Sequence, residues 1–381
     1  MRIPLTTILV FLIISLLISV SVISNFLFYS IDSYAANKPF RITNINTGNV
    51  PTGGQADILG MFTAIEDDVN AKLPSADTST YPSAMANSQA IALKGLGTDY
   101  ATNPDIFIVG AGVGLGADTG PYKLGDLMSG SVDLQKFKGV GLQVSIMAGM
   151  NLKFFDDMPV LFDLIDFKKM SLFVNYMSYN LPSIKNLTGK LSSFGMHVQY
   201  KIYDGFSVPV FFKWGGLDIT TGFDHGSTKI SMSQDYAITK NKDVADSSSI
   251  LRTVVANFTG KAVVESDVSV TTIPLEISTN AQFLYVLTLF GGLGMDFNTG
   301  SSKIAASLVG PITARDETNT INGISADASL NLGNDGKPNS YFARYFVGTQ
   351  FNLWVVKVYT QLNHAIGEDL WGLNVGARIA F

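Results

Sequence analysis

The chain of 381 residues contains no cysteine. A disulfide framework, a thiolate metal site and the acylated cysteine of a lipoprotein are therefore all excluded. Histidine is also scarce, with three residues, and no HExxH or other paired-ligand spacing accompanies them. No serine stands in a nucleophile elbow. We therefore expect no metal site, no cofactor, no catalytic residues and no enzymatic activity.

Charge is the second shortage. Charged residues make up 15% of the chain, against about 25% in ordinary soluble domains. The net charge is -5 and no basic run is present, which argues against nucleic acid as a partner because phosphate neutralisation dominates such binding. The mean hydropathy is +0.25, yet long apolar runs are missing beyond the N-terminus. Apolar residues instead alternate with small or polar ones, which is typical of strands with two different environments.

The stretch 370–381 shows this alternation most clearly. Its apolar face consists of Trp371, Leu373, Val375, Ala377, Ile379 and Phe381. A membrane barrel must close its sheet with a terminal strand whose lipid face carries aromatic rings at both interfaces. We interpret this stretch as the closing strand of a barrel in outer-membrane lipid. Trp371 and Phe381 are then the closure residues and the signal read by the barrel-assembly machinery.

The same two-residue period recurs from residue 105 to the end of the chain. We expect an all-β fold, a transmembrane antiparallel up-and-down β-barrel over residues 105–381. The stretches that alternate divide into about fourteen strands, an even number as in bacterial barrels, with twelve or sixteen as alternatives. Both chain termini then lie in the periplasm. By parity, Val144 and Val347 face lipid.

The first 35 residues hold the one long apolar run of the sequence, from Ile3 to Ile31. Small residues at Ser33 and Ala35 offer a cleavage site, so we interpret 1–35 as a signal peptide that directs the protein to the bacterial outer membrane. The run is also long enough to be an uncleaved anchor helix, which is the alternative.

Residues 36–104 do not alternate, and their apolar residues predict helices instead. Residues 58–73 form an apolar helical stripe beside the acids Glu66, Asp67 and Asp68, and a second, alanine-rich helix is expected over about 83–94. Two interpretations stay open for this segment. It packs under the barrel in the periplasm, or it is a plug in the lumen whose acids meet inward-facing bases.

Several bases and one histidine fall on the inward faces of the expected strands: His197, Lys201, Arg344, Lys357 and Arg378. They either pair with lumen acids or the plug, or attract an anionic or amphipathic solute. Gly112, Gly114 and Gly116 loosely match a dinucleotide fingerprint, but they lie within a strand and not before a helix. We interpret them as inward glycines that leave room for a plug.

Residues 274–297 and 341–354, together with the closing strand, resemble spirochaetal surface proteins of the leptospiral outer-membrane adhesin kind. That resemblance implies surface exposure and binding of host matrix or plasma proteins through the outer loops. The expected architecture is also similar to that of long-chain fatty-acid transporters, which pair an N-terminal hatch with fourteen strands. Two functions follow: a surface-exposed protein that binds host or extracellular macromolecules, or a passive channel for small or hydrophobic solutes.

Overall fold

The computed structural model describes residues 40–72, 80–102, 104, 106–120, 122, 137–155, 166–184 and 186–380. The expected signal peptide, 1–35, and the expected closure residue Phe381 lie outside the described residues. Of the helices in these ranges, none is both long and apolar enough to cross a membrane.

Within the described ranges, strands dominate. They are β1 (Arg41–Thr47), β2 (Phe107–Asp118), β3 (Gly139–Asn151), β4 (Met170–Ile184), β5 (Leu187–Val208), β6 (Phe212–Ala245), β7 (Leu251–Phe283), β8 (Leu287–Asp316), β9 (Ile324–Gly336), β10 (Tyr341–Leu353), β11 (Val356–Ala365) and β12 (Leu370–Ala380). The helices are α2 (Thr52–Lys72), α3 (Tyr81–Ala92) and the short 3-10 turns η3 (Leu152–Phe155) and η4 (Phe167–Lys169).

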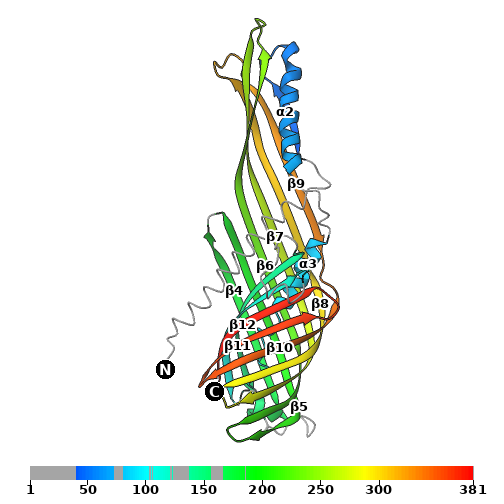
Figure 1. Ribbon diagram of the computed structural model, residues 1–381, viewed down its shortest axis with the longest axis vertical. Coiled ribbons are helices and arrows are strands. Elements are labelled where there is room, and N and C mark those ends of the chain that lie inside the picture. The colour runs from blue at the N-terminus through cyan, green and yellow to red at the C-terminus, as the bar shows by residue number, and fades with distance from the viewer. Residues whose placement is uncertain are drawn as a thin grey trace.

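Ten of these strands close into an antiparallel ring, in the order β2-β3-β4-β5-β6-β7-β8-β10-β11-β12 and back to β2 (Figure 1). The closing contact is β12 against β2, in continuous register from Leu370 opposite Asp118 to Ala380 opposite Ile108. The expected all-β barrel and its closing strand are therefore confirmed.

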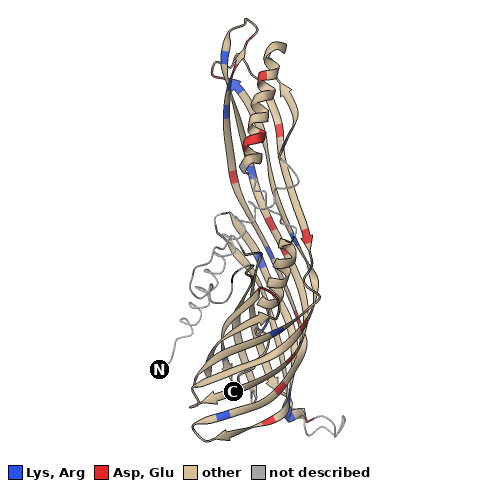
Figure 2. Ribbon diagram, turned by 45° about the vertical axis from the view of Figure 1, so that its right-hand side comes forward, with Lys and Arg blue, Asp and Glu red and all other residues tan. Residues whose placement is uncertain are grey.

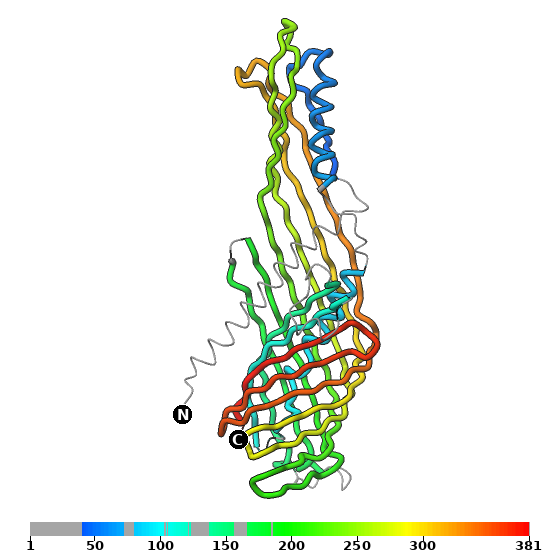
Figure 3. The backbone as a smooth tube through the Cα atoms, viewed as in Figure 1, coloured from blue at the N-terminus to red at the C-terminus, as the bar shows by residue number. Residues whose placement is uncertain are grey.

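Three strands continue far beyond the ring. β8 leaves the barrel and pairs through Ser302–Ala314 with β9, and β9 pairs with β1. Together with the extended ends of β6 and β7, these strands form a projecting sheet that α2 covers (Figure 3). We call this projection, residues 41–72, 233–264 and 306–332, the tower.

The tower has a hydrophobic core of its own. Ile58, Phe62, Ile65 and Val69 follow one face of α2 and are all at most 3% exposed. They join buried strand residues such as Phe258, whose ring meets that of Phe40 edge-on at 5.4 Å. Burying each such side chain contributes about 1.5–3 kcal/mol, so α2 is held firmly in the tower.

The strand number differs from the expected fourteen. In the described residues there are twelve strands, ten of them in the ring. The difference arises because β6, β7 and β8 have 34, 33 and 30 residues, whereas about 9–11 residues cross a bilayer. The sequence interpretation cut each of these strands in two, because their outer halves keep the same alternation.

The two ends of the described chain are well separated. Arg41 lies in the tower, whereas Ala380 lies at the opposite end of the barrel. The first and last described segments therefore end on opposite sides of the barrel, whereas the termini, which we expect to share the periplasmic side, lie outside the described residues. In the described residues, α3 and residues 93–102 make the crossing, because they run through the barrel from the tower end towards the C-terminal end, where β2 begins.

The ring has an apolar outside and a polar inside. Val347 and Ile146 are each 52% exposed on the outer surface, as expected for lipid-facing positions. Val144 is only 7% exposed, so its expected contact with lipid is wrong. β3 pairs with β4 only over Ile146–Asn151, and beyond that point it passes beneath β5. There the Ser193 hydroxyl donates to the Val144 carbonyl at 2.9 Å.

Candidate functional site: a plugged lumen

The barrel interior is occupied by α3 and the segment that follows it. We call α3 with residues 93–102 and Pro104 the plug. Ten of the twelve residues of α3 are buried, and α3 packs against β2, β3, β7, β8, β9 and β12. Its small residues, among them Ala84, Ala86, Ala90 and Ala92, allow the helix backbone to approach the wall closely.

Glycines of the wall complete this close approach. A Cβ atom on Gly114 would overlap the Ala92 carbonyl oxygen, and one on Gly116 would overlap that of Ser88. On the adjoining strand, a Cβ on Gly141 would come within 2.5 Å of the Gln89 backbone nitrogen. These glycines are therefore spacers for a helix packed inside the barrel, as the sequence interpretation proposed for the inward glycines of β2.

Arg378, on β12, ties the plug to the wall. Its guanidinium donates to Asp99 Oδ1 at 2.8 Å and to the Thr98 carbonyl at 2.6 Å. It also lies 3.7 Å from the ring centroid of Tyr359, a cation–π geometry. Arg378 and Asp99 are 1% and 0% exposed. These contacts offset part of the cost of burying the charge pair, although Asp99 Oδ2 and Arg378 Nε have no hydrogen-bond partner among the described residues.

A second charged cluster lies beside the first. Arg344 Nε donates to Asp296 Oδ2 at 2.7 Å, and its other nitrogens reach Glu276 and Asn363. The plug contributes Lys94, whose ammonium is 3.0 Å from Asp296 Oδ1. It also contributes Tyr100, whose hydroxyl donates to Glu276 Oε2 at 2.7 Å. Wall and plug therefore share one network of charges.

His197 lies on the inner wall of β5 and is 3% exposed. Its Nε2 is 2.9 Å from Asp224 Oδ1, which also accepts from Asn175 at 3.2 Å. Gly97 of the plug packs directly against Asn175 and His197. This arrangement positions the plug and offers no nucleophile.

The two remaining inward lysines lie nearer the C-terminal end. Lys201 donates to Asp218 at 3.1 Å and to the Gly215 carbonyl at 2.6 Å. Lys357 borders a cavity there. In the ranges that the structure describes, no three His, Asp or Glu residues are grouped so that they would hold a metal ion.

The acids expected in the plug lie elsewhere. Glu66, Asp67 and Asp68 belong to α2 in the tower, and Figure 2 shows acidic positions on this helix. Glu66 accepts from the Ile42 backbone at 3.2 Å, and Asp68 pairs with Lys240 at 2.5 Å. The expectation that they meet Arg344, Lys357 and Arg378 is therefore wrong. The plug acid is Asp99, which the sequence interpretation missed. A lone acid among Gly95, Gly97 and small polar residues was the available signal.

Of the two expected closure residues, Trp371 can be placed. It lies in β12, half-buried, and its ring stacks on that of His364 with centroids 3.9 Å apart. The stacked rings of His364 and Trp371 link β11 to β12 at the tower end of the barrel.

A closed antiparallel ring, apolar outside and polar within, defines an outer-membrane β-barrel. The chain belongs to the Lsa36-like family, whose model matches residues 50–381. The resemblance to leptospiral surface adhesins expected from residues 274–297 and 341–354 is thereby confirmed. No curated protein sequence matches the chain significantly.

Solved structures to which the chain is similar are also outer-membrane barrels. The toluene transporter TbuX of Ralstonia pickettii is 5% identical over 73% of this chain and 90% of that chain, with a TM-score of 0.22. The β domain of the Bordetella autotransporter BrkA is 9% identical over 73% and 100%, with a TM-score of 0.23. Ail, the attachment invasion locus protein of Yersinia pestis, is 9% identical over 72% and 98%, with a TM-score of 0.21. At such TM-scores the likeness adds nothing to what the strand pairing shows.

Proposed function

We propose that this protein is a surface-exposed binding protein of the bacterial outer membrane, which engages host matrix or plasma macromolecules through its tower. The observation that carries the proposal is the contrast between the two halves of the molecule. The lumen is filled by a hydrogen-bonded plug, whereas the tower is a large ordered structure that projects from one end of the barrel.

The lengths of the turns and of the tower bear on the orientation. At the C-terminal end, β5–β6, β7–β8 and β10–β11 are joined by the short turns 209–211, 284–286 and 354–355. Bacterial barrels have short periplasmic turns and longer outer loops. The connection between β3 and β4, 152–169, is longer, and the turns 185–186 and 366–369 at the tower end are short, so the tower itself is the main support for the orientation. We infer that the tower, with α2 and β1, is the long outer segment and that the C-terminal end faces the periplasm.

The tip of the tower offers an apolar contact within a polar surface. Ile250 and Leu251, at the turn between β6 and β7, are 54% and 70% exposed. Exposed apolar residues rimmed by polar ones are the usual anchors of protein interfaces. The passive channel, our alternative function, has less support, because two adjoining charged clusters fasten the plug to the wall of the lumen.

Binding tests the function directly. Purified protein should bind immobilised basement-membrane matrix or plasma proteins, and the double change Ile250→Asp with Leu251→Asp should weaken binding. The matched control is Ile366→Asp, because Ile366 is 54% exposed at the same end of the barrel but off the tower. Equal binding by the tip variant and the wild type would overturn the role of the tip. If the wild-type protein binds neither matrix nor plasma proteins, the proposed binding function is overturned.

The orientation has a separate test that uses the absence of native cysteine. Asp67→Cys, exposed on α2, should react with a membrane-impermeant maleimide on intact cells. Lys213→Cys, at the opposite end, should react only after lysis. The reverse pattern would place the tower in the periplasm and remove the proposed function.

A further inference from the structure

Three short turns at the C-terminal end of the barrel are built from apolar residues. They are Pro209-Val210-Phe211 between β5 and β6, Leu284-Tyr285-Val286 between β7 and β8, and Trp354-Val355 between β10 and β11. Most of their side chains are exposed, and Trp354 is 90% exposed. We call these three turns the apolar rim. Glycine, asparagine, aspartate and serine dominate turns that stand in water, so apolar turns indicate a different environment.

The backbone of the apolar rim is strained. Four of its residues have a positive φ, a region in which the Cβ atom of an L-residue is crowded: Val210 at 72°, Leu284 at 50°, Tyr285 at 60° and Trp354 at 60°. Leu284 and Tyr285 are the central residues of a tight turn, which the Val286 N–H closes onto the Phe283 carbonyl at 3.0 Å. Asparagine and glycine are strongly favoured at such positions. Apolar residues there cost free energy that another interaction has to offset.

The turns at the other end of the molecule follow the usual rule. In the turns of the tower tip and of the tower end of the barrel, the positions with positive φ hold Ser249, Asn319, Gly323 and Gly367. Among the described residues, apolar residues with a positive φ occur only in the apolar rim. The strained choice is therefore specific to the C-terminal end.

The height of the lipid-facing band shows where the apolar rim lies. On β7 the band begins at Ile273 and continues to Phe283, the last residue before the turn. Ten steps of about 3.4 Å, on a strand tilted by about 40°, give about 26 Å, and the apolar band of outer-membrane barrels is about 25 Å tall. Above Ile273, the exposed ion pair of Lys229 and Asp267 belongs in water. The lipid therefore needs the whole band, which leaves no length of strand between the lipid and the turn.

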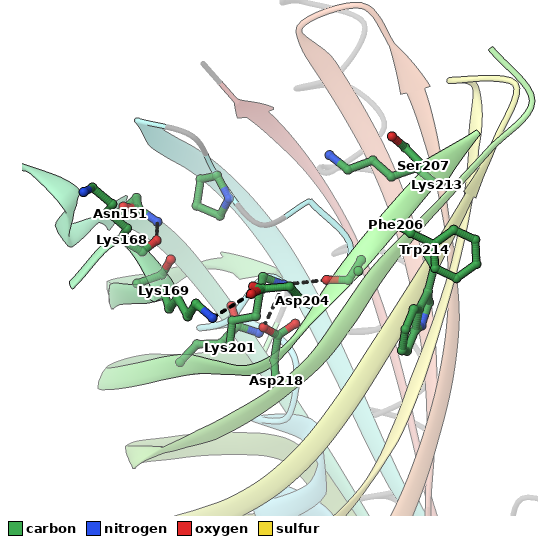
Figure 4. A pocket seen from close by; sticks show the side chains of 15 residues that line it. Asn151, Lys168, Lys169, Lys201, Asp204, Phe206, Ser207, Lys213, Trp214 and Asp218 are labelled. Atoms are coloured by element: carbon green, nitrogen blue, oxygen red, sulfur yellow. Dashed lines mark hydrogen bonds and ion pairs between the residues drawn. The ribbon is translucent and has the colours of Figure 1, made fainter. Parts of the chain in front are cut away.

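Aromatic rings connect this band to the apolar rim. Phe206 and Trp214 of the β5–β6 hairpin meet edge-on with centroids 5.7 Å apart (Figure 4). Phe206 also lies 5.9 Å from Phe212, which in turn lies 5.3 Å from Phe283. Aromatic rings of outer-membrane barrels gather where lipid meets water. Rings and rim form one continuous apolar surface, because Phe212 and Phe283 directly adjoin two of the turns.

Hydrogen bonds between the turns suit an environment without water. The Leu284 N–H donates to the Phe211 carbonyl at 3.1 Å, which joins the first turn to the second. The Val210 N–H donates to the Tyr285 hydroxyl at 3.0 Å. In lipid, backbone groups must find their partners within the protein, because no water is present to supply them.

We propose that the apolar rim is inserted into the bilayer and contacts phospholipid, instead of standing in water. Contact with lipid removes the turn side chains from water, and this gain offsets the strain of the positive φ angles. Phospholipid is a better occupant than a second copy of the chain, because the apolar rim continues the surface that already faces lipid. The proposal concerns the end opposite the tower and does not depend on what the tower binds.

Fluorescence quenching tests the position of the apolar rim. The chain has three tryptophans, and Trp214→Phe with Trp371→Phe leaves Trp354 alone. The purified full-length variant is placed, one copy per nanodisc, in phosphatidylcholine with or without bromine on the acyl chains. Both faces of a nanodisc are open to water, so iodide reaches both ends of the barrel. Bromine should remove most of the Trp354 emission, and iodide should remove little of it.

Two further probes cover the other turns. In a chain whose native tryptophans are replaced, with Trp354→Leu added, Phe211→Trp and Leu284→Trp each place one ring in the apolar rim and should behave like Trp354. The matched control in the same background is Leu251→Trp, because Leu251 is exposed at the tower tip. Its emission should be quenched by iodide and not by bromine. Heat-modifiable migration on a gel checks that each variant contains a folded barrel.

Two results would overturn the proposal. Quenching of the three rim probes by iodide, and not by bromine, would place the apolar rim in water. Protection of these probes from both quenchers would show that protein, and not lipid, covers the apolar rim. Tower binding is measured separately on matrix and plasma proteins, so either result leaves the proposed function untouched.

Discussion

The pair of Asp99 and Arg378 gives the sharpest test of the plug. Asp99→Asn removes the negative charge but keeps the size of the side chain. In the native protein Asp99 Oδ1 accepts from Arg378 at 2.8 Å and from the Ala101 backbone at 2.9 Å. After the change, Arg378 remains buried without its counter-charge, although the Thr98 carbonyl and the Tyr359 ring still contact it.

The expected magnitude follows from burial. Removing one partner of a buried ion pair costs about 3–5 kcal/mol. Because Arg378 keeps a carbonyl and a ring, we expect a smaller cost than this, about 2–3 kcal/mol against the plugged state. Each 1.4 kcal/mol is tenfold in population, so openings of the lumen should become roughly 30- to 140-fold more frequent. Adding Arg378→Gln should recover part of this loss, because no unpaired charge then remains.

Planar-bilayer recordings measure the openings as brief current steps. The matched control neutralises Glu66, Asp67 and Asp68 together, which the structure places in the tower, and should leave the current unchanged. If the Asp99→Asn variant has an intact barrel but shows no more current steps than the wild type, the pair of Asp99 and Arg378 does not hold the plug in place. A current increase in the α2 variant would show that α2, and not α3, blocks the lumen.

The sequence predicted those parts of the barrel whose two faces meet two different environments. In β12 and β2, every second residue faces lipid and the others face the plug, so alternation is strict and the closing contact follows from it. The same parity placed Arg344 and Arg378 in the interior, where both are buried. Which face of a strand a residue occupies depends only on its position in the alternation, so a single sequence can reveal it.

Alternation could not predict where along the strands the barrel ends. In the tower, strands alternate between a hydrophobic core and water, so a two-residue period continues through residues 233–264 without marking where lipid ends. A better signal was charge on the outer face. Lys229 and Asp267, 63% and 46% exposed and paired at 2.8 Å, belong in water and not in lipid.

Which of the two helices fills the lumen could not be predicted from the sequence, because it depends on contacts with residues that are distant in the chain. The apolar stripe of α2 is the stronger helical signal, but its partners are Phe258 and other tower residues distant in the sequence. The alanine-rich α3 fits the lumen because the glycines of β2 admit its backbone. Sequence periodicity shows which helix needs a hydrophobic partner, but not which surface supplies it.

Three further outcomes are expected. Val347→Arg places a charge on the lipid face, which costs about 2–4 kcal/mol near the bilayer midplane, so heat-modifiable migration of the barrel on a gel should be lost. The control Thr239→Arg, on the tower, should migrate normally. Gly114→Val should expel α3, because the new side chain overlaps Ala92, and the plug should become protease-sensitive. Gly333→Ala should stay resistant, because its Cβ makes only an ordinary contact, 3.7 Å from the Ile304 carbonyl oxygen. The last concerns the tip of the tower, where Arg252 donates to Asp246 at 2.7 Å and lies 3.7 Å from Asp316. The Arg252 hydrogen bond and two backbone N–H donors lower the pKa of Asp246. Burial raises the pKa of Asp316, but its hydrogen bonds from Thr318 and Ile321, together with Arg252, outweigh that effect and leave the pKa lowered. Groups with a lowered pKa stabilise the folded tip above the ordinary aspartate value of about 4 and lose this effect as the pH falls through the folded value. Below about pH 4, the backbone amides of residues 246–252 should therefore lose protection from hydrogen exchange, after correction for the effect of pH on the intrinsic exchange rate. Arg252→Met should weaken this dependence of protection on pH. If protection in the native protein stays constant down to about pH 3, these carboxylates do not stabilise the tip.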